Sequence, residues 1–417
     1  MKKSIRPILT IAIVLFSKLL IAQTVTINGN IFLENQTLHD SIVVLFQRVA
    51  PSAYTDSVLT DGSGHFTISI PTGFYDYSFN RIGYLGVSLT GKPLYANTTL
   101  TDTTLEFIGL HGNIKGILAA NTYKVSENLI VQSSDTLIIS PGTILKFKGN
   151  LSILVKGLLL AEGNANDSIV FTSFNTLRWA GVKFYNSNPN SIMSHCLVEK
   201  SDSAGITIYN SSPLISNTTI KNNSNRYNGG APPPYYGGGG VFLSNSNSIL
   251  DGVIISDNSS TFGAGVFSHL GHPIIKNAII KHNRAGLGPG GILLDVNSSL
   301  SVFDTYIFDS YTNNSPTIAS SGGISALGNS NLYINNCVIA NNMGSGISGA
   351  NMYITNTTIA NNKYSGIELY STSNLFVSNC IVVNNKICGL ASNQMSTGNI
   401  DISNSNIYNN HLGNFCN

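Results

Sequence analysis

The chain has 417 residues, a formal net charge of +2, and 10% charged residues against 42% hydrophobic residues. This low charge and high hydrophobicity exclude a disordered chain, and the near-neutral balance gives no support to general binding of nucleic acid or of acidic membrane surfaces. The length is sufficient for more than one domain.

Residues 1–22 have the pattern of an export signal peptide. Basic residues precede an apolar run at 8–16, Lys18 interrupts the apolar segment, and Ala22 offers a small residue for cleavage. The run is too short for a membrane span. Cleavage removes four basic residues and no acid, so the mature chain has a net charge of −2. We therefore expect a secreted or cell-surface protein with no membrane span in its mature chain.

Strand-like runs separated by turn signals follow the signal peptide. Notable turns are Asp61-Gly62-Ser63-Gly64 and Pro71-Thr72-Gly73, which predict a small antiparallel sandwich. These turns, with Gly83-Tyr84, resemble the carboxypeptidase regulatory-like domain, a transthyretin-like sandwich. The resemblance covers residues 23–110 and implies a structural or docking module with no chemistry of its own.

A step from an aliphatic residue to an asparagine three positions later recurs in the C-terminal half. Successive asparagines are mostly 20 to 35 residues apart, which is the period of a solenoid. Stacked turns repeat at about 4.8 Å, so each amide can pair with the asparagine above and below it. We expect a structural ladder of Asn223, Asn258, Asn283, Asn342, Asn362, Asn385 and Asn410.

Two further columns accompany the asparagines. A small residue or short aliphatic, expected to point inward, precedes each aliphatic, and a glycine followed by an aliphatic marks a corner. We expect two short strands and a glycine corner in every turn. The glycines are Gly205, Gly240, Gly265, Gly291, Gly323, Gly346, Gly366 and Gly389.

The strand-like segment 122–160 runs into Trp179-Ala180-Gly181-Val182 and then into the asparagine-bearing turns. Together these resemble right-handed parallel β-helix proteins, found as secreted or surface proteins of bacteria. The resemblance covers residues 111–417, so the fold class is all-β: a right-handed parallel β-helix preceded by a small antiparallel β-sandwich. It implies no single activity, because this fold serves polysaccharide lyases, glycoside hydrolases, epimerases, adhesins and scaffolds.

The five cysteines do not indicate a metal site. Cys196, Cys337 and Cys380 fall in the small-residue column and read as buried small hydrophobic residues. The sequence has no CxxC motif and no His/Cys cluster with zinc spacing, so we expect neither a metal nor another cofactor. Cys388 and Cys416 lie outside the column and could form a disulfide that pins the last turn, or could remain free thiols.

The glycine column also aligns outward residues in adjacent turns. His269 and Asp295 have the same offset from their glycines and are expected to be direct neighbours, as weak candidates for catalysis. Phe242 and Phe267 are expected to form an exposed apolar row beside them. An apolar row next to a polar one is typical of a sugar-binding groove.

A long insertion, 221–240, belongs to the same region. It carries Tyr227, Tyr235 and Tyr236 and could form the wall of a groove over the aromatic row. Alternatively, it could simply cover that row or be a disordered excursion. A loosely basic edge follows the corner asparagines and could meet an anionic glycan, or could be a solvated row of turns. Its residues are Arg284, Met343, Lys363, Lys386 and His411.

We expect a non-enzymatic scaffold that serves adhesion or binds an extracellular polysaccharide or cell-surface glycan. The alternative is a polysaccharide lyase or glycoside hydrolase acting in the groove. A lyase needs a base and a means to neutralise a uronate carboxylate, and a hydrolase needs two opposed carboxylates. From residue 201 onward the seven Asp and one Glu are spread thinly, and no pair of carboxylates is expected to lie side by side.

Overall fold

The computed structural model describes residues 23–34, 36–225, 237–312, 321–370, 373–392 and 398–416. These residues form strands and turns, and no helix suited to crossing a membrane occurs among them. The chain divides between Gly109 and Leu110 into two compact units. The predicted all-β fold class is confirmed.

The first unit consists of two four-stranded sheets around a common core. In one sheet β1 lies between β4 and β7 and also pairs with β8, and the other has the order β3-β2-β5-β6. Residues of β1 alternate between buried and partly exposed, and Phe46, Phe66, Tyr75 and Phe79 fill the interior. The strands are β1 (Thr24–Leu33), β2 (Val43–Ala50), β3 (Tyr54–Leu59), β4 (His65–Pro71), β5 (Gly73–Asn80), β6 (Val87–Leu94), β7 (Thr98–Thr99) and β8 (Thr103–Leu105).

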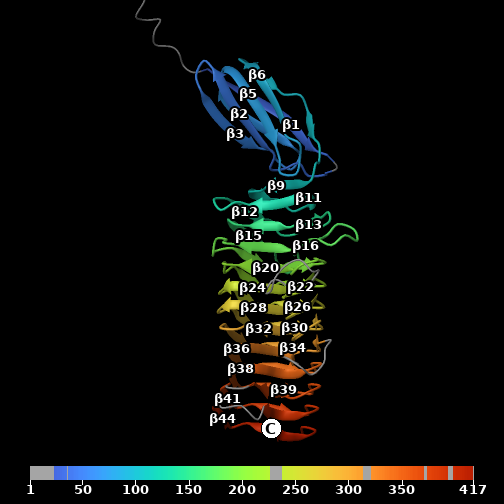
Figure 1. Ribbon diagram of the computed structural model, residues 1–417. Coiled ribbons are helices and arrows are strands. Elements are labelled where there is room, and N and C mark those ends of the chain that lie inside the picture. The colour runs from blue at the N-terminus through green and yellow to red at the C-terminus, as the bar shows by residue number, and fades with distance from the viewer. Residues whose placement is uncertain are drawn as a thin grey trace, which may run out of the picture. The chain divides into compact units, whose positions relative to one another are not determined.

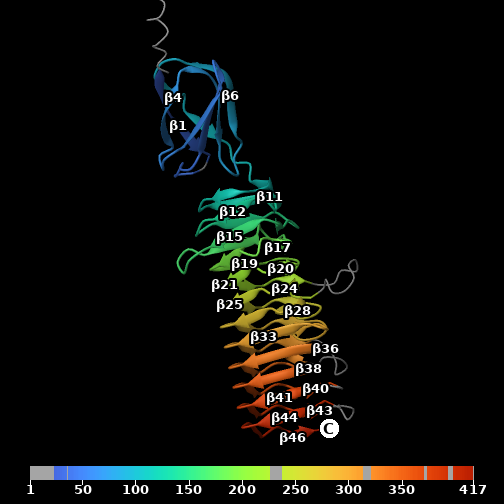
Figure 2. The same cartoon turned by 90° about the vertical axis from the view of Figure 1, so that its left-hand side faces the viewer.

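The second unit is a parallel sheet of 34 strands wound into a right-handed solenoid (Figures 1 and 2). Each full turn contributes three strands, which we assign to faces A, B and C in chain order. The prediction of two strands per turn was wrong. Between faces A and B the chain is turned by a single corner residue with positive φ, such as Asn217 or Asn356. Because this corner is so short, the strands of faces A and B look like one continuous strand in the sequence.

The first turns of the solenoid contain strands that begin or bridge the faces. Strand β11 contributes its first residues to face B and its last to face C. These strands are β9 (Leu110–Asn113), β10 (Gly116–Leu118) and β11 (Thr122–Val131).

The later strands stack in parallel register with the strand one turn earlier. Face A comprises β12 (Thr136–Ile139), β15 (Leu158–Glu162), β18 (Ile192–Ser194), β21 (Leu214–Ser216), β25 (Ile249–Asp251), β29 (Ile274–Lys276), β33 (Ser299–Phe303), the second halves of β36 (Ser321–Asn335) and β38 (Ser345–Thr355), β41 (Leu375–Ser378) and β44 (Ile400–Ser403).

Face B carries a strand in each of the same turns. It comprises β13 (Ile144–Phe147), β16 (Ile169–Ser173), β19 (Cys196–Glu199), β22 (Thr219–Lys221), β26 (Ile254–Ser256), β30 (Ile279–Lys281), β34 (Tyr306–Phe308), β37 (Val338–Ala340), β39 (Thr358–Ala360), β42 (Ile381–Val383) and β45 (Asn406–Tyr408).

Face C comprises β14 (Ile153–Val155), β17 (Val182–Tyr185), β20 (Ile206–Tyr209), β24 (Val241–Ser246), β28 (Val266–Gly271), β32 (Ile292–Leu294), the first halves of β36 and β38, β40 (Ile367–Leu369), β43 (Cys388–Ser392) and β46 (Gly413–Cys416). A small sheet at the corner between faces B and C is formed by β23 (Ser224–Asn225), β27 (Ser259–Ser260), β31 (Arg284–Ala285) and β35 (Tyr311–Thr312).

The seven asparagines form a buried ladder at the corner between faces B and C. Asn362 is typical: its Nδ2 donates to Asn385 Oδ1 at 3.0 Å and to the Ile339 carbonyl at 3.2 Å, and its backbone N–H donates to Asn385 Oδ1 at 3.1 Å. Its side chain is fully buried. One turn has Ser310 instead, whose backbone N–H donates to Asn342 Oδ1 at 3.1 Å.

The glycine column lies against the ladder and against the backbone of the next turn, where a Cβ at Gly265 would lie 2.5 Å from the Gly291 carbonyl oxygen. A Cβ at Gly366 would lie 2.8 Å from Asn385 Nδ2 and 2.5 Å from Val382 Cγ1, and one at Gly389 would lie 2.7 Å from Asn410 Nδ2. The glycine therefore leaves room for the amide beside it. In the turns that carry a ladder asparagine, the glycine and asparagine columns of the sequence are therefore in contact in the structure.

The residue before most ladder asparagines is also an asparagine, for a different reason. Asn361 and Asn384 have φ of 58° and 57°, in the left-handed region that asparagine tolerates better than most residues. In an Asn-Asn pair the first residue therefore turns the chain and the second joins the ladder.

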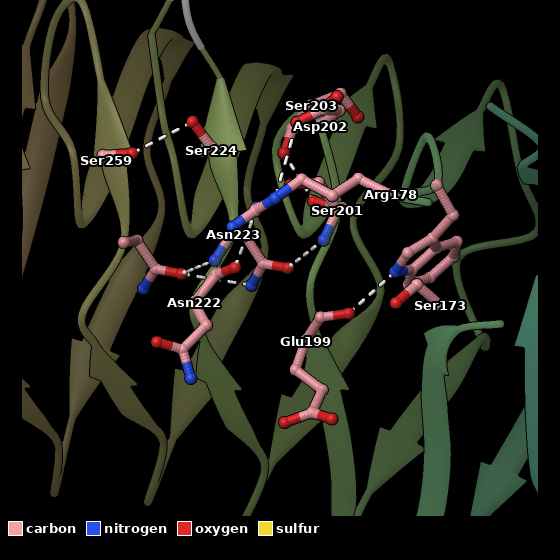
Figure 3. Close-up of polar contacts among 12 residues, drawn as sticks. Ser173, Arg178, Glu199, Ser201, Asp202, Ser203, Asn222, Asn223, Ser224 and Ser259 are labelled. Atoms are coloured by element: carbon pink, nitrogen blue, oxygen red, sulfur yellow. Dashed lines mark hydrogen bonds and ion pairs between the residues drawn. The ribbon is translucent and has the colours of Figure 1, made fainter. Parts of the chain in front are cut away.

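An aromatic pair precedes the ladder along the solenoid, and Figure 3 shows the polar contacts around Ser201 and Asn223 where the ladder begins. Trp179 stacks on Phe147 with ring centroids 4.3 Å apart, and its Nε1 donates to the Glu199 carbonyl at 2.7 Å. In the next turn the backbone N–H of Ser201 donates to Asn223 Oδ1 at 3.0 Å, the first asparagine of the ladder. Arg178 Nη1 donates to the Ser201 carbonyl at 2.9 Å and holds this corner from outside.

The last turn is closed by a disulfide between Cys388 and Cys416, whose Cα atoms are 6.1 Å apart. Cys196, Cys337 and Cys380 are free and buried, as their place in the inward column indicated. Burial raises the pKa of the Cys196 thiol to about 12 and that of Cys337 to about 11. Both thiols therefore stay protonated near neutral pH and are poor nucleophiles.

We predict that Asn362→Ala lowers the free energy of unfolding by about 1–3 kcal/mol, because it leaves buried amide and backbone groups unpaired. Asn406→Ala is the matched control, since Asn406 is an exposed residue of face B. Urea unfolding of both variants measures the difference. Equal losses of stability would mean that the ladder does not stabilise the turns.

Candidate functional site

The structure brings His269 and Asp295 together on adjacent turns of face C. His269 Nδ1 lies 2.7 Å from Asp295 Oδ2, and the two side chains are 24% and 21% exposed. Asp295 Oδ1 also accepts the backbone N–H of Val296 at 2.9 Å. His269 follows Gly265 at the same distance in the sequence as Asp295 follows Gly291, and this was sufficient to predict that the two side chains are neighbours.

The prediction that Phe242 and Phe267 form an exposed row beside this pair is wrong. Phe242 and Phe267 are 4% and 5% exposed and pack with Ala204 and Leu293, with Phe262 against them. The backbone at Gly237 lies so close to Phe267 that a side-chain carbon there would collide with its ring. The corner segments between faces B and C fold over this row, so these phenylalanines form a secondary core.

The remaining predicted binding residues do not complete a site on face C. Tyr227, Tyr235 and Tyr236 lie outside the described residues. Arg284 is exposed and belongs to β31 in the corner sheet, which is a different element from the strands that carry the His269–Asp295 pair.

An open site lies instead on face A. A hollow of about 460 Å³ is lined by Ser301 and Phe303 of β33, by Tyr333, Ile334 and Asn335 of β36, and by Tyr353 and Thr355 of β38. Tyr333 is 40% exposed. None of the lining residues carries a charge at neutral pH, so the hollow combines apolar rings with neutral polar groups. We call it the face A hollow.

The rings beside the hollow form a stack along the solenoid axis. Tyr333 and Tyr353 lie 4.9 Å apart with 14° between their planes, and Tyr353 and Phe376 lie 5.0 Å apart with 5° between theirs. Each ring in the stack therefore covers the face of the next. The stack ends without a further ring on both sides. Tyr333 is in register with Ser301 of the preceding turn, which is too small to cover a ring, and Phe376 is in register with Asp401 of the following turn.

The polar side of the hollow is formed by Asn335 and Thr355, which occupy equivalent positions in successive turns. Asn335 Oδ1 accepts a hydrogen bond from Asn356 Nδ2 at 3.0 Å, so the group that Asn335 can offer to a ligand is its own Nδ2. Thr355 Oγ1 donates to the Ile334 carbonyl at 3.4 Å and keeps its lone pairs as acceptors. A donor and an acceptor thus stand one turn apart, beside the exposed ring.

The sequence contains a signal for this stack. Asparagine, aliphatic, aromatic and aliphatic residues follow one another in three successive turns. The three segments are Asn331-Leu332-Tyr333-Ile334, Asn351-Met352-Tyr353-Ile354 and Asn374-Leu375-Phe376-Val377. The open ring face could not be read from this motif, because it depends on Ser301 one turn earlier.

No group of three or more His, Cys, Asp or Glu side chains within the described residues could hold a metal ion. Lys183, on the outer side of face C, has its pKa lowered by burial, and no acid forms an ion pair with it among these residues.

Comparison with known proteins agrees with the geometry. A family model described as "right handed beta helix region" matches residues 308–410. The matched segment lies within the parallel β-helix that residues 110–417 form. Protein bark beetle of Drosophila melanogaster is 29% identical over 105 residues, which are 23% of this chain. The chain spans only 3% of the length of that protein.

Solved structures with the same fold are distant. The A-module of the mannuronan C-5 epimerase AlgE4 of Azotobacter vinelandii is 14% identical, with 71% of this chain and 90% of that chain covered and a TM-score of 0.40. The catalytic domain of a GH87 α-1,3-glucanase is 12% identical, with 94% and 86% covered and a TM-score of 0.30. Both TM-scores lie below 0.5, so these structures indicate nothing about the activity of this chain.

We predict that Phe267→Ala destabilises the protein by about 3–5 kcal/mol, the cost of truncating a buried phenylalanine. Tyr333→Ala removes one exposed ring and one stacking contact, and its cost is about 1 kcal/mol. Thermal unfolding of both variants tests the assignment of the two rings. A larger loss for Tyr333→Ala would reverse the assignment of core and site.

Proposed function

We propose that this chain is an exported, non-enzymatic scaffold that binds a neutral glycan in the face A hollow. The observation that carries the proposal is the open face of Tyr333 above the small Ser301, next to Asn335 and Thr355. A pyranose ring has an apolar C–H face that packs on an aromatic ring and a rim of hydroxyl groups that exchange hydrogen bonds with amides and hydroxyls. The hollow provides both kinds of contact.

The charge of the hollow supports a neutral ligand. A uronate or sulfated sugar that entered it would lose part of its hydration without gaining a cation, which is unfavourable. A neutral sugar loses only hydroxyl hydration, which the Asn335 amide and Thr355 hydroxyl replace. The repeat of the stack along the axis favours an extended chain of sugars lying across successive turns, with one ring seated on Tyr333.

Export belongs to the same proposal. The N-terminal residues 1–22 have the pattern of a signal peptide, and a disulfide closes the last turn. Disulfides persist in oxidising compartments. Residues 23–110, with their resemblance to a regulatory-like sandwich, would then serve as a docking module beside the glycan-binding solenoid.

A glycan array, followed by calorimetric titration with the best neutral oligosaccharide, tests the function. We expect Tyr333→Ala to weaken binding at least tenfold, since truncating a central aromatic anchor costs roughly 2 kcal/mol or more. Tyr408→Ala is the matched control, because Tyr408 is a 52% exposed tyrosine of face B outside the hollow. An array without neutral ligands, or unchanged binding by Tyr333→Ala, would reject the proposal.

A carbohydrate-active enzyme is the second candidate function, and the His269–Asp295 pair is the observation that favours it. A carboxylate that holds His Nδ1 leaves Nε2 as the atom able to accept or donate a proton. No second carboxylate forms part of this arrangement within the described face C, so the pair lacks the partner that a hydrolase of two opposed acids requires.

Incubation with a panel of polysaccharides separates the two functions. We expect neither ultraviolet-absorbing unsaturated products nor new reducing ends. Turnover that disappears in His269→Gln and persists in His272→Gln, a change at an exposed histidine of the same region, would establish the enzyme instead.

A further inference from the structure

The last three ladder turns carry three parallel rows of side chains at the corner between faces B and C. The central row is basic, one flanking row consists of exposed asparagines, and the other is apolar. The rows are Lys363, Lys386 and His411; Asn361, Asn384 and Asn409; and Tyr364, Ile387 and Leu412. We call this surface the terminal cation strip.

The ladder fixes the spacing of the basic row. The backbone N–H groups of Lys363, Lys386 and His411 each donate to the carbonyl of the ladder asparagine one turn earlier, at 2.9, 3.0 and 3.0 Å. Because parallel strands repeat at about 4.8 Å, the three side chains leave the backbone at that interval. All three residues are exposed. The row is therefore a regular series that places the two lysine cations one turn apart, with a histidine in the turn after them.

This arrangement is electrostatically unfavourable by itself. Like charges directly opposite each other on neighbouring strands are destabilising. In the part of the chain that the structure describes, neither Lys363 nor Lys386 forms an ion pair, whereas Lys276 pairs with Asp251 at 3.1 Å on face A. None of the positions in the three rows holds an acidic residue. An external anion is the partner that would relieve the repulsion.

We propose that the terminal cation strip binds a linear anionic polysaccharide of the uronic-acid type. The lysines would meet the carboxylates, the corner asparagines would exchange hydrogen bonds with the hydroxyl groups, and the apolar row would cover the C–H faces of the sugar rings. The chemistry matches in all three rows, and each row repeats from turn to turn. A polymer of repeating charge lying along the solenoid axis therefore makes the same set of contacts in consecutive turns.

This site is independent of the face A hollow. The hollow lies on face A and has no charged lining residue, whereas the lysines of the strip lie at the corner between faces B and C. The two sites are therefore expected to select glycans of different charge. Binding at the strip is also expected to weaken with added salt, because exposed charges are screened. Binding in the neutral hollow is not expected to depend on salt in this way.

The test is titration of the full-length mature protein with polygalacturonate at low and high salt. We expect Lys363→Gln/Lys386→Gln to weaken binding about thirtyfold, since each lysine near an anionic surface contributes roughly a factor of five. The control is Lys148→Gln/Lys156→Gln, which makes the same change in net charge at two other exposed lysines of the solenoid. Tyr333→Ala should leave this binding unchanged.

Three results would overturn the proposal. One is the absence of polygalacturonate binding by the unaltered protein at low salt. Another is an equal loss in both double variants, which would show attraction to net charge alone. The third is loss in Tyr333→Ala, which would place the anionic glycan in the hollow. Failure of neutral glycans to bind would reject the proposed function and leave the strip intact.

Discussion

The hydrogen-bonded stack of asparagines at the corner between faces B and C sets the geometry of the whole solenoid. Where two ladder asparagines follow one another, the buried amide bonds to the asparagine of the next turn and to a backbone carbonyl of the preceding turn, so these turns are held in one register. The unpaired alternative is costly, because a buried amide without partners loses its hydration and gains nothing. The glycine beside each amide is a consequence of the same contact, since Gly366 and Gly389 leave the space that Asn385 and Asn410 occupy.

Because the register is fixed, residues at equivalent positions of successive turns form rows along the surface of the solenoid. Side chains at equivalent positions stand about 4.8 Å apart along the axis whatever their chemistry. Most of the solenoid interior is aliphatic, with buried aromatic rings in its early turns and the asparagine ladder at one corner. The aromatic stack that ends at Tyr333 over Ser301 and the basic row through Lys363 and Lys386 are two such outward rows. In both rows, equivalent side chains recur from turn to turn, as the proposed binding of an extended polysaccharide chain needs. The two rows differ in charge.

The sequence was sufficient for what depends on periodicity. The fold class, the asparagine ladder, the inward cysteines and the pairing of His269 with Asp295 follow from counting along a repeat whose register is rigid. Exposure was harder to predict. Phe267 alternates outward, as expected, but the segment at Gly237 covers it, and alternation within a strand carries no information about neighbouring corner segments. Conversely, the open face of Tyr333 depends on a serine 32 positions earlier in the chain, at the same place one turn before.

The central claim is that the ladder holds the turns in register, and native-state hydrogen exchange of its backbone amides tests this most directly. The backbone N–H groups of Asn258, Asn342, Asn362 and Asn385 donate to the side chain of the next ladder asparagine. The account predicts that these amides exchange only through global unfolding, with protection equal to that of the core strands. Exchange as fast as that of exposed corner amides would contradict it, because the ladder would then open without unfolding the turns.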